Sequence, residues 1–207
     1  MTVDFWIDPA CPWCLITSRW LVEVQGERDL TVRWRPFSLL RKNGDELEER
    51  YRRIVEPSHR ALRVLAATAE AHGEDAAGRL YTALGTRVHH DGDRELAGLA
   101  DAVRAAGLDA GLAAAADDAA HDAAIAASMD EALAAAGEDI GVPTIRIGGP
   151  GRPAFFGPVL SPAPTGAQAL ALYDGLVAVT EAGDGALWEL KRGRQVSPEM
   201  PERPVGL

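Results

Sequence analysis

The two cysteines of the chain, Cys11 and Cys14, are separated by only two residues and directly follow a run with the composition of a β-strand. Residues 3–7 are mostly β-branched or aromatic, and an Asp-Pro pair that favours a turn closes the run. From Cys11 onward, apolar residues recur near helical spacing until Gly26, and Pro12 is compatible with a helix because it falls in the first turn. The sequence therefore predicts a strand, a short turn, and two cysteines at the start of a helix.

This placement favours redox chemistry of the two thiols. The first turn of a helix presents unpaired backbone N–H groups and the positive end of the helix dipole, which stabilise a thiolate. Cys11 is the predicted nucleophile, and Cys14, one turn further on, is predicted to displace a mixed disulfide and close the ring. The alternatives are two incidental cysteines or half of a zinc site. Zinc would need two further ligands from histidines that lack finger-like spacing to the cysteines, namely His59, His72, His89, His90 and His121, so no metal is predicted.

Composition limits the function classes. The 207 residues include 21 Lys plus Arg and 31 Asp plus Glu, a formal net charge of −10, and no block of consecutive basic residues, which argues against nucleic-acid binding. No apolar run reaches the roughly 18 residues that a membrane span needs. The N-terminus shows no export signal, and two neighbouring cysteines form no disulfide framework, so a cytoplasmic protein is expected.

The remaining segments complete a mixed α/β pattern. Residues 30–37 alternate apolar and polar side chains, which predicts a second strand. Residues 45–136 are rich in Ala, Leu, Arg and Glu and predict helices, with an interruption at Glu56-Pro57 and N-caps at Asp93 and Asp109. Residues 143–147 and 154–156 then predict a β-hairpin, and 165–181 a last helix, so the expected order is β-α-β, a helical block, and β-β-α.

This order gives a domain prediction. Residues 1–42 and 138–190 form one α/β domain in two parts, and residues 43–137 form an inserted helical domain. Residues 191–207 are a Pro-rich tail, expected to be loosely held.

The pattern resembles the DsbA family over nearly the whole chain. The resemblance rests on the β-α-β unit with Cys11-Pro12-Trp13-Cys14 at its helix, the helical insertion, and Val142-Pro143-Thr144 leading into the hairpin. It implies a thioredoxin fold with an inserted all-helical domain. It also implies that Pro143 follows a cis peptide bond, which costs little before proline, and that Val142 and Pro143 face the cysteines.

Within that family, three segments are similar to the actinobacterial mycothiol-dependent nitroreductases: residues 8–20, 81–89 and 155–161. The resemblance implies a cytosolic enzyme with a redox-active Cys11–Cys14 dithiol that is kept reduced by mycothiol. Disulfides and nitro-aromatic compounds are the implied substrates. Mycothiol, another low-molecular-weight thiol, or a redoxin of the mycoredoxin or thioredoxin type is the implied electron donor.

Pro12 is a candidate substrate-binding or modulating group, and so are four further residues that each have a plainer alternative. Trp13, between the cysteines, is a candidate for stacking on a flat substrate, and the alternative is packing on the helical insertion. Tyr51 lies where the resembling family lines its cleft, but a half-buried Tyr is common on an amphipathic helix. His89 is a candidate gate or proton donor, although a cation at a helix C-terminus alone accounts for it. Asn43 is a candidate hydrogen-bond donor to substrate, or simply part of a turn.

Other readings stay open. Asp8 either builds the turn before Cys11 or modulates its thiolate. Gly148-Gly149-Pro150-Gly151 is a turn inside the hairpin rather than a phosphate loop, so no bound nicotinamide or flavin is predicted and the electrons must come from a thiol. The alternative function is that of a DsbA-like or polyketide-isomerase-like protein acting as a disulfide isomerase or as a holdase chaperone. The chain is expected to be a monomer or a homodimer.

Overall fold

The structure is a computed structural model of the 207-residue chain, and it describes residues 1–182 and 197–204. The strands are β1 (Thr2–Ile7), β2 (Thr31–Pro36), β3 (Thr144–Ile147) and β4 (Ala154–Phe156). The α-helices are α1 (Pro12–Glu27), α2 (Leu39–Asn43), α3 (Glu49–His72), α4 (Glu74–His89), α5 (Leu99–Ala105), α6 (Asp122–Ala136) and α7 (Gly166–Ala182). Three 3₁₀ helices are η1 (Gly44–Glu46), η2 (Ala110–Asp117) and η3 (Ala119–His121).

The four described strands form one mixed sheet in the order β2-β1-β3-β4. β1 pairs in parallel with β2 and antiparallel with β3, and β3 pairs antiparallel with β4. The parallel pair is joined through α1, whereas the antiparallel pair β3–β4 is a hairpin, as strand direction requires. The fold is therefore the thioredoxin-type α/β arrangement expected from the sequence, and the predicted strands agree with the observed ones to within about one residue at each end.

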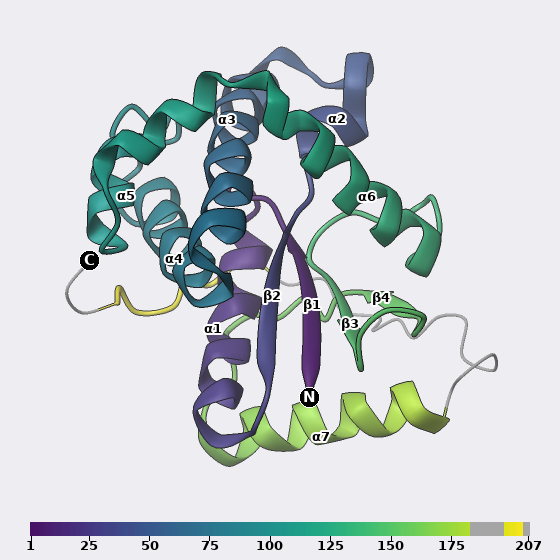
Figure 1. Ribbon diagram of the computed structural model, residues 1–207. Coiled ribbons are helices and arrows are strands. Elements are labelled where there is room, and N and C mark those ends of the chain that lie inside the picture. Colours follow the sequence, from purple (N-terminus) through teal and green to yellow (C-terminus); the bar gives the residue numbers. More distant parts are fainter. Residues whose placement is uncertain (183–196, 205–207) are drawn as a thin grey trace.

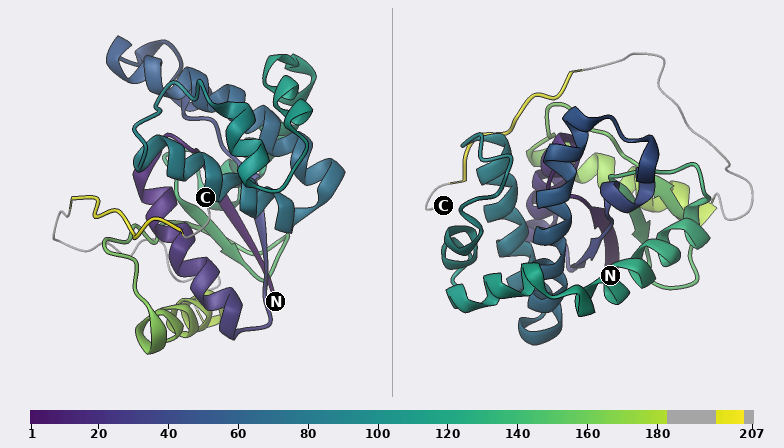
Figure 2. Two further views of the ribbon diagram at one scale, coloured as in Figure 1. Left: turned by 90° about the vertical axis from the view of Figure 1, so that its left-hand side faces the viewer. Right: turned by 90° about the horizontal axis from the view of Figure 1, so that it is seen from above.

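The sheet lies between two helical layers. α1 and α7 pack on each other on one side of the sheet, and α6 contacts β2 and β4 from the other side (Figure 2, right). In Figure 1, β1 and β2 run upward, and the helices from α2 to α6 gather around and above their upper, carboxyl-terminal ends. Since α1 begins just after β1 ends, the cysteines lie at the end of the sheet where the helical segment meets it.

Three tryptophans predicted to be core residues are buried: Trp6, Trp20 and Trp34. The indole of Trp6 donates to the carbonyl of Ser128 at 2.8 Å, which ties the sheet to α6. The indole of Trp20 donates to the carbonyl of Ala169 at 2.9 Å, which ties α1 to α7. A buried indole needs an acceptor for its N–H, so these bonds fix both helical layers in place.

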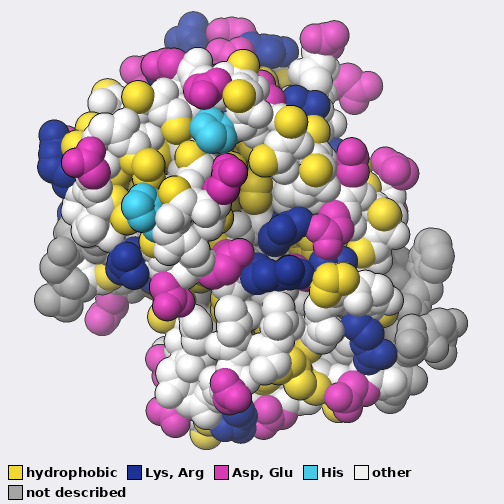
Figure 3. Space-filling model, viewed as in Figure 1, with side chains coloured by type: hydrophobic (Ala, Val, Ile, Leu, Met, Phe, Trp, Pro, Cys, Tyr) yellow, Lys and Arg dark blue, Asp and Glu magenta, His cyan; other side chains and the backbone are white. Residues whose placement is uncertain are grey.

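A row of charged side chains crosses the sheet. Asp4 on β1 is fully buried and forms ion pairs with Arg33 on β2 at 2.5 Å and with Arg146 on β3 at 2.6 Å. Both are its register partners on the neighbouring strands. Glu131 on α6 pairs in turn with Arg146 and with Arg35. On the face shown in Figure 3, basic, acidic and apolar side chains are interspersed rather than separated into large patches of one kind.

The helical segment departs from the sequence prediction in two places. The expected interruption at Glu56-Pro57 is wrong, because α3 continues through Pro57, and the buried Val55 and Ala61 hold both halves against the core. The start of the Ala-rich stretch forms η2 and η3 rather than one helix with α6. Asp118 separates them, since its carboxylate accepts from the amide of Ala120.

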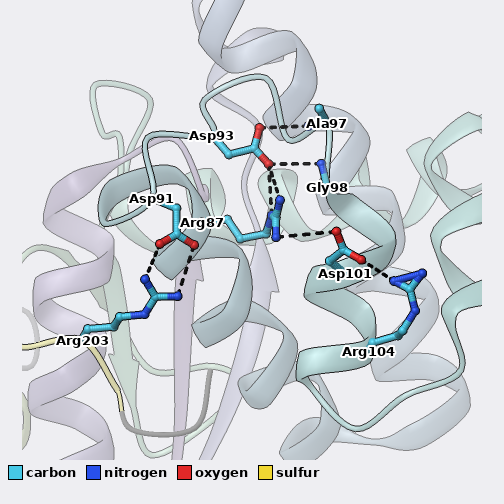
Figure 4. A network of polar contacts seen from close by, with 8 residues as sticks. All are labelled: Arg87, Asp91, Asp93, Ala97, Gly98, Asp101, Arg104 and Arg203. Atoms are coloured by element: carbon cyan, nitrogen blue, oxygen red, sulfur yellow. Dashed lines mark hydrogen bonds and ion pairs between the residues drawn. The ribbon is translucent and has the colours of Figure 1, made fainter.

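Asp109 caps η2 as predicted, but Asp93 is not a helix N-cap. Figure 4 shows its carboxylate accepting from the amides of Ala97 and Gly98 and from Arg87. Asp93 thus organises the loop before α5, because three donors from different points of the chain converge on it.

The described part of the tail, residues 197–204, is held at two points. Ser161 accepts from the amide of Glu199 at 2.9 Å and donates to the carbonyl of Ser197 at 2.7 Å. Arg203 pairs with Asp91 beside α4 (Figure 4), next to a cavity of about 60 Å³. The expectation that the tail is loosely held stays a prediction. The end of the predicted 138–190 segment and the first part of the tail lie outside the described residues.

Candidate active site

Cys11 is the N-cap residue of α1, and Pro12 occupies the first helical position. The amide of Cys11 donates to the carbonyl of Asp8 at 2.9 Å, which closes a tight turn between β1 and the helix. Both cysteines are free thiols, Cys11 being 6% exposed and Cys14 fully buried. The sulfur nearer the surface is thus the one that the sequence nominated as nucleophile.

Val142, from the loop between α6 and β3, contacts Cys11, and Pro143 follows it in that loop. The thiol of Cys11 donates to the carbonyl of Val142 at 3.5 Å. The Val142–Pro143 peptide bond is cis, as the resemblance implied, and the carbonyl of Pro143 accepts from the amide of Gly157 at 2.8 Å. The loop between α6 and β3 therefore lies beside the sulfur of Cys11, and the hydrogen bond from Gly157, just after β4, holds that loop in place.

Asp8 is a fully buried carboxylate that joins three elements at this site. One oxygen accepts from the amide of Ala10 at 2.8 Å and from the hydroxyl of Ser58 on α3, and the other accepts from the amide of Leu39 on α2 at 2.8 Å. Burial raises the pKa of Asp8 above its ordinary value, and these three hydrogen bonds oppose the rise. Asp8 therefore builds the turn, as one of the two open interpretations held, and also anchors that turn to the helical segment.

The environment of Cys14 disfavours its thiolate. Burial is the largest cause that raises the pKa of Cys14 well above the ordinary value, followed by the hydrogen bond and the charge of Cys11. The negative charge of Asp8 adds to the rise, while a hydrogen bond from the Asp8 backbone opposes it. The inner thiol is thus protonated at neutral pH until something assists its ionisation.

His89, at the end of α4, contacts the turn that precedes Cys11. Its Nε2 lies 2.9 Å from the carbonyl of Pro9, so that nitrogen carries the hydrogen and donates it. Burial lowers the pKa of His89 to about 4, so the imidazole is neutral at neutral pH. The explanation of His89 as a cation at a helix C-terminus is therefore wrong. The histidine braces the active-site turn instead.

The other predicted site residues lie further out. Trp13 is half-buried and packs against the core. Tyr51 is 48% exposed in the first turn of α3, with the guanidinium of Arg50 4.7 Å from its ring centre. The side chain of Asn43 donates to the carbonyl of Leu39 within α2. The contacts of Tyr51 and Asn43 do not connect them to the cysteines, so their roles in binding remain predictions.

Sequence reasoning missed Ser58, which contacts this site, and the buried Tyr81. Ser58 binds Asp8, and nothing in the amphipathic pattern of its helix marks it. Tyr81 is fully buried on α4, and burial raises the pKa of its phenol well above the ordinary value, with smaller contributions from the charges of Cys14 and Cys11. A polar tyrosine within the apolar stripe of Leu80 and Leu84 is the one signal that pointed to it. Among the described residues, no three metal-ligating side chains come together to form a cation site.

A family model described as "Rv2466c-like: Mycothiol-dependent nitroreductase Rv2466c" matches residues 10–192. The chain belongs to this family. The match includes both cysteines, the whole helical segment and the hairpin. A second similarity is to the uncharacterized protein Rv2286c of Mycobacterium tuberculosis, which is 32% identical over an alignment covering 92% of this chain and 81% of the relative.

Solved structures support the fold. The cytosolic disulfide reductase DsbM of Pseudomonas aeruginosa is 19% identical, with a TM-score of 0.58 over 86% of this chain and 100% of the other. The same protein has also been solved with glutathione, at a TM-score of 0.59. A probable DsbA oxidoreductase of Streptomyces coelicolor is 18% identical, with a TM-score of 0.57 over 99% of both chains. These similarities show a DsbA-like thioredoxin fold.

Proposed function

We propose that the protein is a thiol–disulfide oxidoreductase that uses Cys11 and Cys14 to reduce disulfides and nitro-aromatic compounds, with mycothiol as its electron donor. The observation that carries the proposal is the asymmetry of the two sulfurs. Cys11 caps α1 at the edge of the site beside the Val142 carbonyl, whereas Cys14 is enclosed behind it. That geometry suits an attacking thiol with a resolving thiol at its back.

With a disulfide substrate, the chemistry has two steps. The Cys11 thiolate attacks one substrate sulfur, the substrate S–S bond breaks, and the first thiol leaves with a proton. Cys14 then attacks the Cys11 sulfur, which forms the protein disulfide and releases the second thiol. Two molecules of mycothiol restore the dithiol and leave as mycothiol disulfide. The family description supports mycothiol as donor, and the glutathione complex of DsbM supports a small thiol in general.

With a nitro-aromatic substrate, the dithiol supplies two electrons and two protons. The nitro group is reduced to a nitroso group with release of one water, and the dithiol becomes the disulfide. The family description supports this activity. Trp13 and the Val142–Pro143 loop are the groups proposed to contact the flat ring, because they flank the outer sulfur in sequence and in space.

The proposal includes a cytoplasmic location, which the structural similarity to the cytosolic disulfide reductase DsbM supports. Among the described residues, no helix has the length and apolar character to cross a bilayer. A redoxin as an alternative donor, and the oligomeric state, remain predictions.

Single-turnover and steady-state assays test the proposal. The reduced protein is mixed with a low-molecular-weight disulfide or a nitro-aromatic probe, and mycothiol is then supplied as the sole reductant, with glutathione in parallel. Cys11→Ser is expected to abolish both activities, and Cys14→Ser to accumulate a Cys11–mycothiol disulfide visible by mass spectrometry. Ser18→Ala, which alters a buried hydroxyl of the same helix that bonds to Leu15, is the control.

Two results would contradict the proposal. Full activity in a folded Cys11→Ser protein would remove Cys11 as nucleophile. Equal turnover rates with glutathione and with mycothiol would contradict mycothiol as the specific electron donor, but would leave the proposed dithiol chemistry standing.

A further inference from the structure

The hydroxyl of Ser58 on α3 holds the turn that carries Cys11. It accepts from the amide of Ala10, the residue directly before Cys11, at 3.0 Å, and it donates to the carboxylate of Asp8. Ser58 is buried, so bulk water does not compete for either hydrogen bond. One side chain of the helical segment therefore binds the turn at two of its residues.

The next residue of α3, His59, acts on the other oxygen of Asp8 through α2. Nδ1 of His59 lies 2.9 Å from the hydroxyl oxygen of Ser38, which caps α2 and accepts from the amide of Arg41. The amide of Leu39, the residue after Ser38, donates to the second carboxylate oxygen of Asp8 at 2.8 Å. His59 thus orients the cap of the short helix whose first amide holds Asp8.

These contacts close a ring, which we call the Asp8 ring and which consists of Asp8, Leu39, Ser38, His59 and Ser58. Each link between neighbours in this ring is either a hydrogen bond or the peptide bond between two consecutive residues. The polar side chains of the ring are all buried, so a broken hydrogen bond would leave a buried polar group without a partner. Because the ring has no free end, one member moves only if a hydrogen bond elsewhere in it stretches or breaks.

The partners of His59 assign its hydrogens. The hydrogen bond from Arg63 lowers the pKa of Asp122, so this carboxylate on α6 is ionised and only accepts. Nε2 of His59, which lies 3.1 Å from the Asp122 carboxylate, therefore carries the hydrogen. Burial lowers the pKa of His59, so Nδ1 has no hydrogen at neutral pH and accepts from the Ser38 hydroxyl. The two imidazole nitrogens thus have separate partners, since Nε2 binds α6 and Nδ1 binds Ser38.

We propose that Ser58 and His59 are positioning residues for Cys11, and that through the Asp8 ring they hold its sulfur in the place from which it attacks a substrate disulfide. The inference rests on the proposed function and concerns its first step. In that step the Cys11 thiolate bonds to one substrate sulfur, the substrate S–S bond breaks, and the other substrate sulfur leaves as a thiolate. The step is fast only when the attacking sulfur is aligned with the bond that breaks, so a turn that shifts slows it.

The probe dithiobis(nitrobenzoic acid) measures this step by itself. It is a symmetrical disulfide whose leaving thiolate is coloured, and in a Cys14→Ser background Cys11 is the only thiol of the chain. Stopped-flow absorbance then gives the rate constant for attack by Cys11. Ser58→Ala is expected to lower this rate constant roughly fivefold, the factor that one hydrogen bond of typical strength contributes. The matched control is Ser128→Ala, which removes a buried hydroxyl without a hydrogen-bond partner among the described residues and should keep the rate.

Two substitutions of His59 separate the two imidazole nitrogens. Asn places its side-chain oxygen near the position of Nδ1 and still accepts from Ser38, whereas Gln places its amide near Nε2 and still donates to Asp122. His59→Asn is therefore expected to keep the rate constant for attack by Cys11, and His59→Gln to lower it roughly fivefold. Urea unfolding should find similar losses of stability in both variants, because each loses one of the two hydrogen bonds of the imidazole. A merely structural role of His59 would lower the stability without separating the two rates.

The outcomes separate this inference from the proposed function. Equal rates in His59→Asn and His59→Gln, or an unchanged rate in a folded Ser58→Ala protein, overturn the positioning role even when Cys11→Ser is inactive and the dithiol mechanism stands. If Ser58→Ala does not fold, the two His59 variants decide the question by themselves. Full catalytic activity of Cys11→Ser removes the reaction itself, and with it the step that Ser58 and His59 would serve.

Discussion

The charge state of His89 leads to a prediction about acid stability. Its pKa is about 4 in the folded protein, whereas the ordinary value is 6.5. Above pH 6.5 both the folded and the unfolded chain hold a neutral imidazole, so His89 contributes no pH dependence. As the pH falls from 6.5 toward 4, the unfolded chain binds a proton that the folded protein does not, so the free energy of unfolding decreases. Linkage gives a loss of about 2 kcal/mol at pH 5 and about 3 kcal/mol near pH 4.

His89→Leu removes this titration and also the hydrogen bond to Pro9, which is worth about 1 kcal/mol. Urea unfolding of the reduced proteins should therefore find the variant about 1 kcal/mol less stable at pH 7.5. At pH 5 the order should reverse, because the unchanged protein alone has lost about 2 kcal/mol to His89. His72→Gln, at an exposed position at the end of α3, is the control and should follow the unchanged protein at both pH values. Parallel pH dependence in His89→Leu would refute the assignment of a neutral, buried imidazole.

Two further pairs of variants test the packing around the site by urea unfolding. Asp8→Ala should lower the free energy of unfolding by about 3 kcal/mol, because it leaves three buried donors without their acceptor. The control Asp117→Ala, at an exposed ion pair, should lower it by less than about 1 kcal/mol. Equal effects of the two substitutions would argue against Asp8 as the anchor of the turn. Gly78→Ala should destabilise the folded protein by about 1–3 kcal/mol, because the new Cβ would lie 2.6 Å from the Trp34 indole. The control Gly175→Ala has open space around the new Cβ and should stabilise the folded protein by roughly 0.5–1 kcal/mol. A stable Gly78→Ala protein would mean that α4 does not pack on β2 as closely as described.

The fold and the outer part of the site were predictable because local signals determine them. The alternation in residues 30–37, the punctuation by Asp8-Pro9 and Gly26, and the helical spacing between them act over a few residues. They are sufficient to put Cys11 and Cys14 at the start of a helix after a strand. The position of Val142 beside Cys11 came from the family resemblance, since no local pattern relates residues 131 positions apart.

The inner part of the site was not predictable because it depends on contacts between distant segments. Asp8 receives hydrogen bonds from residues 31 and 50 positions further along, and periodicity carries no information about such pairs. The same limit explains the error at His89. Its place at a helix end suggested a cation. Burial against the Pro9 turn, however, destabilises the protonated imidazole by more than the helix dipole stabilises it.

The two sulfurs therefore differ in what each needs to become a nucleophile. Cys11 lies at the N-terminus of α1, at the edge of the site and next to the carbonyl of Val142. Cys14 lies in an enclosed space where burial, the Cys11 thiol and the Asp8 carboxylate all oppose its ionisation. Burial is the largest of these effects, and the Cys11 thiol contributes more than the Asp8 charge. This environment keeps the inner thiol protonated, so the site favours the order in which the outer sulfur reacts first.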